Sequence, residues 1–171
     1  MARVSHRTGV EEKGQRSLRS SDVYLPKRGL KEASLCSACG ALYRNKRWYT
    51  GEEALKAARE ETGLNKVLCP ACQRIEDGNP AGIVTLSGAY LAKHARDIIN
   101  EVKHVEAKSM VKNPLGRIME VKEDRNTITI STTEDKLAQK VGREIFKAHH
   151  GELHYQWSHE ENLVRVSWTR E

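Results

Sequence analysis

The cysteines of the chain lie in two C-x-x-C pairs, Cys36/Cys39 and Cys69/Cys72, and no cysteine is left over. Two residues between cysteines let one tight turn aim both thiolates at a single ion, and Gly40 after the first pair suits a sharply bent backbone. Two such turns supply four thiolates, which form the closed tetrahedral shell of a structural zinc ion. The spacing therefore predicts one structural Zn²⁺ bound by all four cysteines.

Two other interpretations of these cysteines stay open from the residues alone. A pair of disulfides would suit a secreted protein, but the segment after Met1 has no apolar run of the kind found in a signal peptide. A redox dithiol is compatible with Cys69-Pro-Ala-Cys72, because Val67-Leu68 precedes it as an apolar strand precedes a thioredoxin-type motif. The redox interpretation leaves the first C-x-x-C pair without a role.

Composition limits the class of protein. With 171 residues, the chain is long enough for one ordinary domain and a small module. No apolar run reaches the length needed to cross a membrane, so we expect a soluble protein, and the cysteine usage without a signal peptide predicts a cytoplasmic one. The sequence contains no phosphate-binding glycine loop, nucleophile elbow or H-E-x-x-H pattern. We therefore expect neither enzymatic activity nor a small-molecule substrate.

The net charge of +6 is concentrated near the N-terminus. Residues 1–50 contain 11 Lys and Arg against 4 Asp and Glu, a net of +7, whereas the remaining residues contain 18 against 19, a net of −1. A localised positive field is typical of a protein that binds a polyanion, although a solvated tail has the same composition. We expect residues 1–30 to be a flexible basic arm that becomes ordered on RNA phosphates. Its predicted RNA contacts are Arg3, Arg7, Arg16, Arg19, Lys27 and Arg28.

Basic and aromatic residues are mixed in the segment after the first cysteine pair, Arg44-Asn-Lys-Arg-Trp-Tyr49. Stacking on unpaired bases together with phosphate contact requires this mixture. The residues of this segment that we expect to contact RNA are Arg44, Lys46, Arg47 and Trp48. Alternatively, Trp48 only covers the metal site, because so small a module has little other core.

The rest of the sequence predicts the elements that position these residues. Residues 31–80 are predicted to form the zinc-binding module, a zinc ribbon with a helical insertion between its cysteine turns, and Glu76–Pro80 has the composition of a linker. Residues 81–171 follow the order β-α-β-β-α-β-β. That order predicts a ferredoxin-like α+β domain with an additional hairpin strand, in which two helices cover one face of an antiparallel sheet.

These motifs resemble those of the ribosomal large-subunit export adaptors, the NMD-three family. In the run from Cys36 to Tyr49, a basic stretch and a Trp follow C-x-x-C-G, as in that family. The second cysteine pair, Cys69/Cys72, is followed by Arg74, and the helix-strand pattern from Thr133 to Tyr155 is also similar. It covers roughly residues 36–171. The family's extra N-terminal zinc pairs and long C-terminal region with nuclear export signals are missing, so the chain looks like a small prokaryotic relative.

The resemblance implies zinc ligation by the four cysteines, RNA contact by Arg44, Arg47 and Trp48, and docking on the large ribosomal subunit. The sequence thus predicts a non-catalytic, zinc-dependent RNA-binding protein associated with that subunit or its precursors, in assembly, stabilisation or translation control. Two alternatives stay open, a redox or nucleic-acid-processing enzyme that uses Cys69 and Cys72, and a zinc-ribbon DNA-binding regulator.

Overall fold

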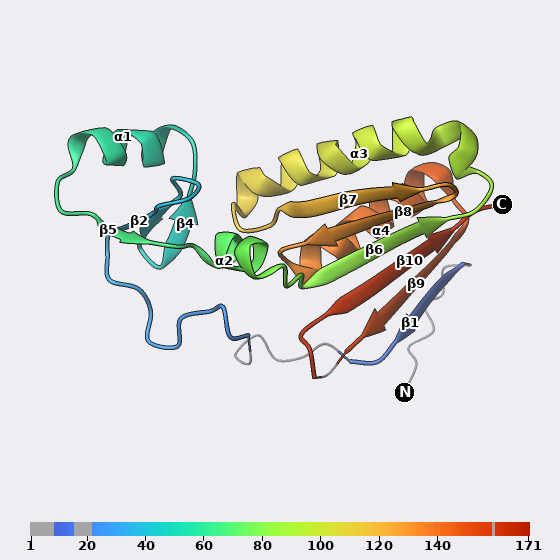
Figure 1. Ribbon diagram of the computed structural model, residues 1–171, viewed down its shortest axis with the longest axis horizontal. Helices are drawn as coiled ribbons and strands as arrows, with labels where there is room; N and C mark the ends of the chain where they lie inside the picture. Colours follow the sequence, from blue (N-terminus) through green and yellow to red (C-terminus); the bar gives the residue numbers. More distant parts are fainter. Residues whose placement is uncertain (1–8, 16–21, 159) are drawn as a thin grey trace.

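The computed structural model describes residues 9–15, 22–158 and 160–171, which form two units with separate β-sheets (Figure 1). A small unit contains the cysteines and a four-stranded sheet, and a larger unit combines a six-stranded sheet with two long helices. The predicted α+β class is confirmed.

In chain order the elements are β1 (Val10–Lys13), β2 (Ser34–Cys36), β3 (Leu42–Arg44), β4 (Arg47–Tyr49), α1 (Glu52–Glu60), β5 (Asn65–Val67), α2 (Pro70–Asp77), β6 (Gly82–Ser87), α3 (Leu91–Lys112), β7 (Ile118–Asp124), β8 (Thr127–Thr132), α4 (Asp135–His149), β9 (Glu152–Trp157) and β10 (Val164–Thr169).

The small unit has the strand order β4-β3-β2-β5, with β2 antiparallel to β3 and parallel to β5. Asn45 and Lys46 join β3 to β4, and both have positive φ angles of 52° and 60°, as the central residues of a tight hairpin turn do. The helical insertion predicted between the cysteine pairs is α1. It buries Ala54 and Ala57 against Leu42 of the sheet.

The second cysteine pair opens a helix, which the sequence did not predict. Pro70 occupies a first-turn position of α2, where its missing N–H removes no helical hydrogen bond. Gly78 ends the helix with a φ of 59°, and its N–H donates to the carbonyl of Arg74. The predicted linker at Glu76–Pro80 is therefore helical over its first two residues. The Pro and Gly signals at the helix ends outweigh its linker-like composition.

The larger unit has the strand order β1-β9-β10-β6-β8-β7. Its elements from β6 to β10 follow the predicted sequence of strands and helices, and β8 lies antiparallel between β6 and β7. The expected antiparallel sheet is wrong, because β10 enters between β9 and β6 and runs parallel to β6. Its alternate residues Val164, Val166 and Trp168 are fully buried, so this strand has the burial of a central strand and not of an edge.

One face of the larger sheet is covered by α3 and α4, and the core fills the space between them (Figure 1). α4 comes especially close to β10 at Gly142, where an added Cβ would lie 2.5 Å from Cγ1 of Val166. The opposite face carries polar side chains such as Thr85, Thr129 and Ser167, which are neighbours across three strands. In the described strands this face has no Phe, Tyr or Trp, on which RNA-binding sheets stack bases.

Part of the predicted flexible arm belongs to the larger sheet. β1 pairs in parallel with β9, and a carboxylate oxygen of Glu11 lies 2.9 Å from Nδ1 of His154. The prediction of a flexible arm over residues 1–30 does not hold for Val10–Lys13. A four-residue edge strand is too short to produce a periodic sequence signal. Residues 1–8 and 16–21 of the predicted arm lie outside the described residues.

The end of the predicted arm is attached to α2. Both carboxylate oxygens of Asp22 lie 2.9 Å from Nη2 of Arg74, which is almost fully buried. The Tyr24 hydroxyl donates to Asp77 over 2.8 Å, and the Arg74 guanidinium lies 4.3 Å from the centre of the Tyr24 ring. A buried Arg requires a charged partner of this kind, which Asp22 supplies.

No helix in the described part of the chain is both long and apolar enough to cross a membrane.

Candidate metal centre

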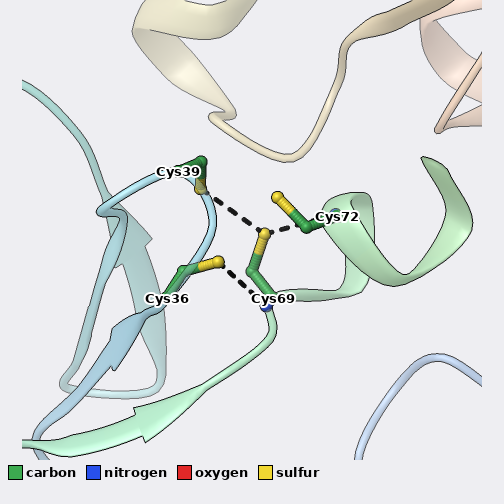
Figure 2. A group of neighbouring side chains, drawn as sticks. All are labelled: Cys36, Cys39, Cys69 and Cys72. Atoms are coloured by element: carbon green, nitrogen blue, oxygen red, sulfur yellow. Dashed lines mark hydrogen bonds between the residues drawn. The ribbon is translucent and has the colours of Figure 1, made fainter. Parts of the chain in front are cut away.

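The four cysteine side chains converge on one point (Figure 2). Cys36 ends β2 and Cys39 lies in the following turn, while Cys69 precedes α2 and Cys72 lies in its first turn. Their sulfur atoms all lie within 4.8 Å of one another, and those of Cys39 and Cys69 are 3.8 Å apart. A tetrahedral shell with metal–sulfur bonds of about 2.3 Å spaces its sulfurs about 3.8 Å apart. No disulfide joins these residues, so the cluster can hold a metal ion.

Strand pairing explains why the two cysteine pairs meet. The parallel pairing of β2 with β5 places Cys36 opposite Val67, two residues before Cys69. The N–H of Cys69 then lies 3.3 Å from the sulfur of Cys36, and the N–H of Cys72 lies 3.5 Å from the sulfur of Cys69. Gly40, with a φ of 74°, closes the first turn by donating its N–H to the carbonyl of Cys36 over 2.9 Å. Backbone N–H groups therefore help to orient the sulfurs of Cys36 and Cys69 toward the centre of the cluster.

The surroundings of the cluster act differently on the individual thiols. Burial raises the pKa of Cys69 and of Cys72 above the ordinary value of a thiol. Burial also opposes ionisation of Cys36, but the backbone N–H groups of Cys69, Cys39 and Ala38 outweigh it and lower the pKa of Cys36 to about 6. Without a cation, Cys69 and Cys72 therefore stay protonated at neutral pH. A divalent ion that prefers thiolates offsets this cost of ionisation.

Arg117 reaches the cysteine cluster from the larger unit. Its Nη2 lies 3.1 Å from the sulfur of Cys39, and its Nη1 lies 3.4 Å from the sulfur of Cys72. Burial by itself lowers the pKa of the guanidinium, but the hydrogen bond and the charge of Cys39 raise it above its usual range. The side chain therefore stays charged. Four thiolates and one divalent ion leave an excess of negative charge, and the guanidinium offsets part of it.

The loop between α3 and β7 holds Arg117 in place. Its Nε donates to the carbonyl of Pro114 over 2.9 Å, and its backbone N–H donates to the hydroxyl of Thr133 over 2.8 Å. In the same loop, the buried side chain of Leu115 packs against the cysteines. Neither Leu115 nor Arg117 was predicted from the sequence to contact the cysteines. The only local signal is an Arg after the Asn113-Pro114 break, and this does not distinguish a metal-site residue from any surface Arg.

The residues predicted to contact RNA have different surroundings. Outside the described residues are Arg3, Arg7, Arg16 and Arg19. Lys27, Arg28, Lys46 and Arg47 are exposed. Arg44 is half-buried and forms an ion pair with Glu61. The N–H of Lys46 donates to a carboxylate oxygen of Glu32 over 3.0 Å, which ties the β3–β4 turn to the chain that follows Arg28. The structure thus leaves the cations of residues 27–28 and of the β3–β4 turn exposed.

Trp48, on β4, contacts both the cysteine cluster and Tyr43 of β3. It is half-buried and packs against the cysteine cluster, and its ring centre lies 5.3 Å from that of Tyr43 in a tilted arrangement. This placement matches the covering role considered for Trp48. Its contact with RNA stays a prediction.

A second group of polar side chains joins α3 to α4 in the larger unit. A carboxylate oxygen of Glu101 lies 3.2 Å from Nε2 of His149, whose Nδ1 lies 3.0 Å from the Tyr90 hydroxyl. The Tyr90 ring stacks on His94 at 3.9 Å and has the guanidinium of Arg170 at 4.0 Å. These contacts connect the start of α3, the end of α4 and the chain after β10. The group therefore has a structural role.

No family model matches this chain, and no match is found among the curated proteins or among the solved structures.

Proposed function

We propose that this chain is a non-catalytic RNA-binding protein that depends on one structural Zn²⁺ and associates with the large ribosomal subunit or its precursors. The observation that carries the proposal is a four-cysteine cluster, contacted by a guanidinium, in a chain whose β3–β4 turn and residues 27–28 expose cations that make no ion pair in the described residues. These cations, which we call the small-unit basic patch, are Lys27, Arg28, Lys46 and Arg47.

The ligand set favours structural zinc. Sites with four cysteines are tetrahedral and leave no position for a substrate or an activated water molecule. Arg117 also occupies one side of the cluster, because it donates to two of its sulfurs over 3.1 and 3.4 Å. The β3–β4 hairpin and the two cysteine segments support a zinc ribbon with a helical insertion. The order of elements from β6 to β10 supports a ferredoxin-like domain extended by one strand.

The redox alternative has less support. A C-x-x-C dithiol attacks as a thiolate, which requires a lowered pKa at its first cysteine. Burial instead raises the pKa of Cys69 and of Cys72. In addition, Cys36 and Cys39 lie in the same cluster, which an isolated redox pair does not need.

The DNA-binding alternative requires a recognition helix with a basic, base-reading surface. The helices of the small unit do not offer one. α1 exposes the three carboxylates of Glu52, Glu53 and Glu60, and α2 ends in Glu76 and Asp77. These acidic residues repel a DNA backbone.

The small-unit basic patch suits phosphate contacts, which supply affinity and position but little sequence choice. The large ribosomal subunit enters the proposal through the resemblance of the run from Cys36 to Tyr49. That run is now placed at a metal centre with its basic turn exposed to solvent.

Sedimentation of a cell extract at low salt tests the proposal. We expect the wild-type protein to sediment with the large subunit. Replacing the four cations of the small-unit basic patch by Gln weakens this association. A matched control replaces four lysines that have carboxylate partners within 4.0 Å, so that the net charge changes equally: Lys13, Lys56, Lys122 and Lys147. A wild-type protein that stays at the top of the gradient contradicts the ribosome proposal.

A further inference from the structure

The exposed side of α3 is strongly basic. The helix buries a single stripe, formed by Leu91, Ile98, Val102 and Val105, so most of its surface faces solvent. Its exposed acidic residue is Asp97. Its exposed Lys and Arg residues, which we call the α3 basic face, are Lys93, Arg96, Lys103, Lys108 and Lys112.

The other two carboxylates of α3 are engaged in internal contacts. Glu101 lies 3.2 Å from Nε2 of His149, and Glu106 accepts the backbone N–H of Ile118 over 2.6 Å. No residue of the α3 basic face forms an ion pair within the ranges that the structure describes. The positive field of the helix is therefore largely uncompensated on its solvent side. A charge count along the sequence does not show the positive charge on the exposed side of α3, because residues 51–171 as a whole carry a net charge of −1.

We propose that the α3 basic face binds the phosphate backbone of double-stranded RNA. From Lys93 to Lys112 the helix extends about 28 Å at 1.5 Å per residue, and with 3.6 residues per turn Lys93, Arg96 and Lys103 lie on one side of it, while Lys108 and Lys112 lie further around its circumference. Proteins recognise RNA duplexes mainly by shape and by backbone contacts. Single strands are bound by stacking on successive aromatic side chains, and the exposed positions of α3 carry no Phe, Tyr or Trp and a single His, His104. This surface is separate from the small-unit basic patch, so the inference goes beyond the proposed function.

An anionic membrane is a less suitable partner for this face. Helices that bind membranes insert an apolar face beside their cations. The apolar stripe of α3 is instead buried against the sheet, and Val111 is its one large apolar residue that is exposed. The face can therefore contact phosphates but has no apolar surface to insert into lipid.

Binding of the full-length, zinc-loaded protein to a short RNA duplex of mixed sequence, measured by fluorescence anisotropy at several salt concentrations, tests the inference. The variant carries Lys93→Gln, Arg96→Gln and Lys103→Gln. Its control carries Lys56→Gln, Lys122→Gln and Lys147→Gln, which removes the same charge from lysines that already pair with Glu. We expect the α3 variant to lose affinity on the order of 100-fold at 0.1 M salt and its salt slope to become shallower by about 2 to 3. Unchanged thermal melting of both variants establishes that they fold.

Three outcomes overturn the inference. In the first, the α3 variant binds the duplex as tightly as its control does. In the second, the protein binds the single strand of the same sequence as tightly as the duplex, and both affinities depend equally on the α3 basic face. In the third, the protein does not bind the duplex but binds vesicles that contain anionic lipid, and this binding requires the α3 basic face. A variant of the small-unit basic patch separates the two proposals. If it binds the duplex like wild type while the α3 variant does not, the inference holds even where the ribosome proposal fails.

Discussion

Nη2 of Arg117 lies 3.1 Å from the sulfur of Cys39, although the two residues are 78 positions apart in the chain. Cys39 belongs to the small unit, whereas Arg117 comes from the loop before β7 in the larger one. The metal centre is therefore completed by a residue outside the small unit. Hydrogen bonds to ligating atoms tune a metal site and hold its ligands in place, so Arg117 couples the two units through the centre.

Replacing Arg117 by Met is expected to weaken metal binding about 10- to 100-fold, because partners of ligating atoms contribute to affinity by this much. The variant keeps a long side chain but loses the donors to Cys39 and Cys72. Competition with a chromogenic chelator measures the affinity. Arg59→Met, at an exposed position of α1 in the same small unit, is the control. Equal metal affinity of the two variants refutes this role of Arg117.

Removal of the metal is expected to unfold the small unit while the larger unit stays folded. The small unit has two minor apolar clusters, one of which contains the ligands Cys36, Cys69 and Cys72 themselves, so its folding depends on the ion. The larger unit has its own core around Ile98, Ile130 and Trp168. Amide hydrogen exchange with and without chelator locates the change. Loss of protection throughout residues 81–171 contradicts the expectation.

Leu137→Ala is expected to lower the free energy of unfolding of the larger unit by about 2–5 kcal/mol, because it leaves a cavity in the core. The Leu137 side chain is 1% exposed. Urea denaturation monitored by circular dichroism measures the effect, and zinc content should stay that of wild type. Leu55→Ala, at a side chain that is 56% exposed, is the matched control and changes stability by less than about 0.5 kcal/mol.

Gly142→Ala is expected to destabilise the protein, although Ala is intrinsically favoured over Gly in a helix by about 1 kcal/mol. The added Cβ would lie 2.5 Å from Cγ1 of Val166 and 3.1 Å from Cδ1 of Leu153, both of which are fully buried. Overpacking of this kind costs about 1–3 kcal/mol. Thermal unfolding decides the sign. A higher melting temperature than that of wild type shows that α4 is not packed this closely on β10.

The sequence was informative wherever a short pattern determines local geometry. The C-x-x-C spacing predicted the convergence of Cys36, Cys39, Cys69 and Cys72, and alternation of polar and apolar residues predicted β9 and β10. Contacts between distant segments have no such pattern. The approach of Arg117 to Cys39 depends on how the larger unit packs on the small one, and the insertion of β10 beside β6 depends on the pairing of whole strands.

Charge on the surface was also predicted incompletely. A count along the chain attributes the basicity to residues 1–50, because acidic and basic residues cancel in the remainder. In the folded chain, the acids Glu101 and Glu106 point into internal contacts, whereas the cations of α3 remain exposed. Only the three-dimensional structure separates these two groups.

The metal content of the purified protein, measured together with the reactivity of its thiols, tests the central claim most directly. We expect one zinc ion per wild-type chain, with thiols that react slowly until a chelator is added. Cys39→Ser removes the ligand that is exposed and is expected to lose the metal. Wild-type protein without zinc, whose thiols all react at once or are paired in disulfides, would contradict the account.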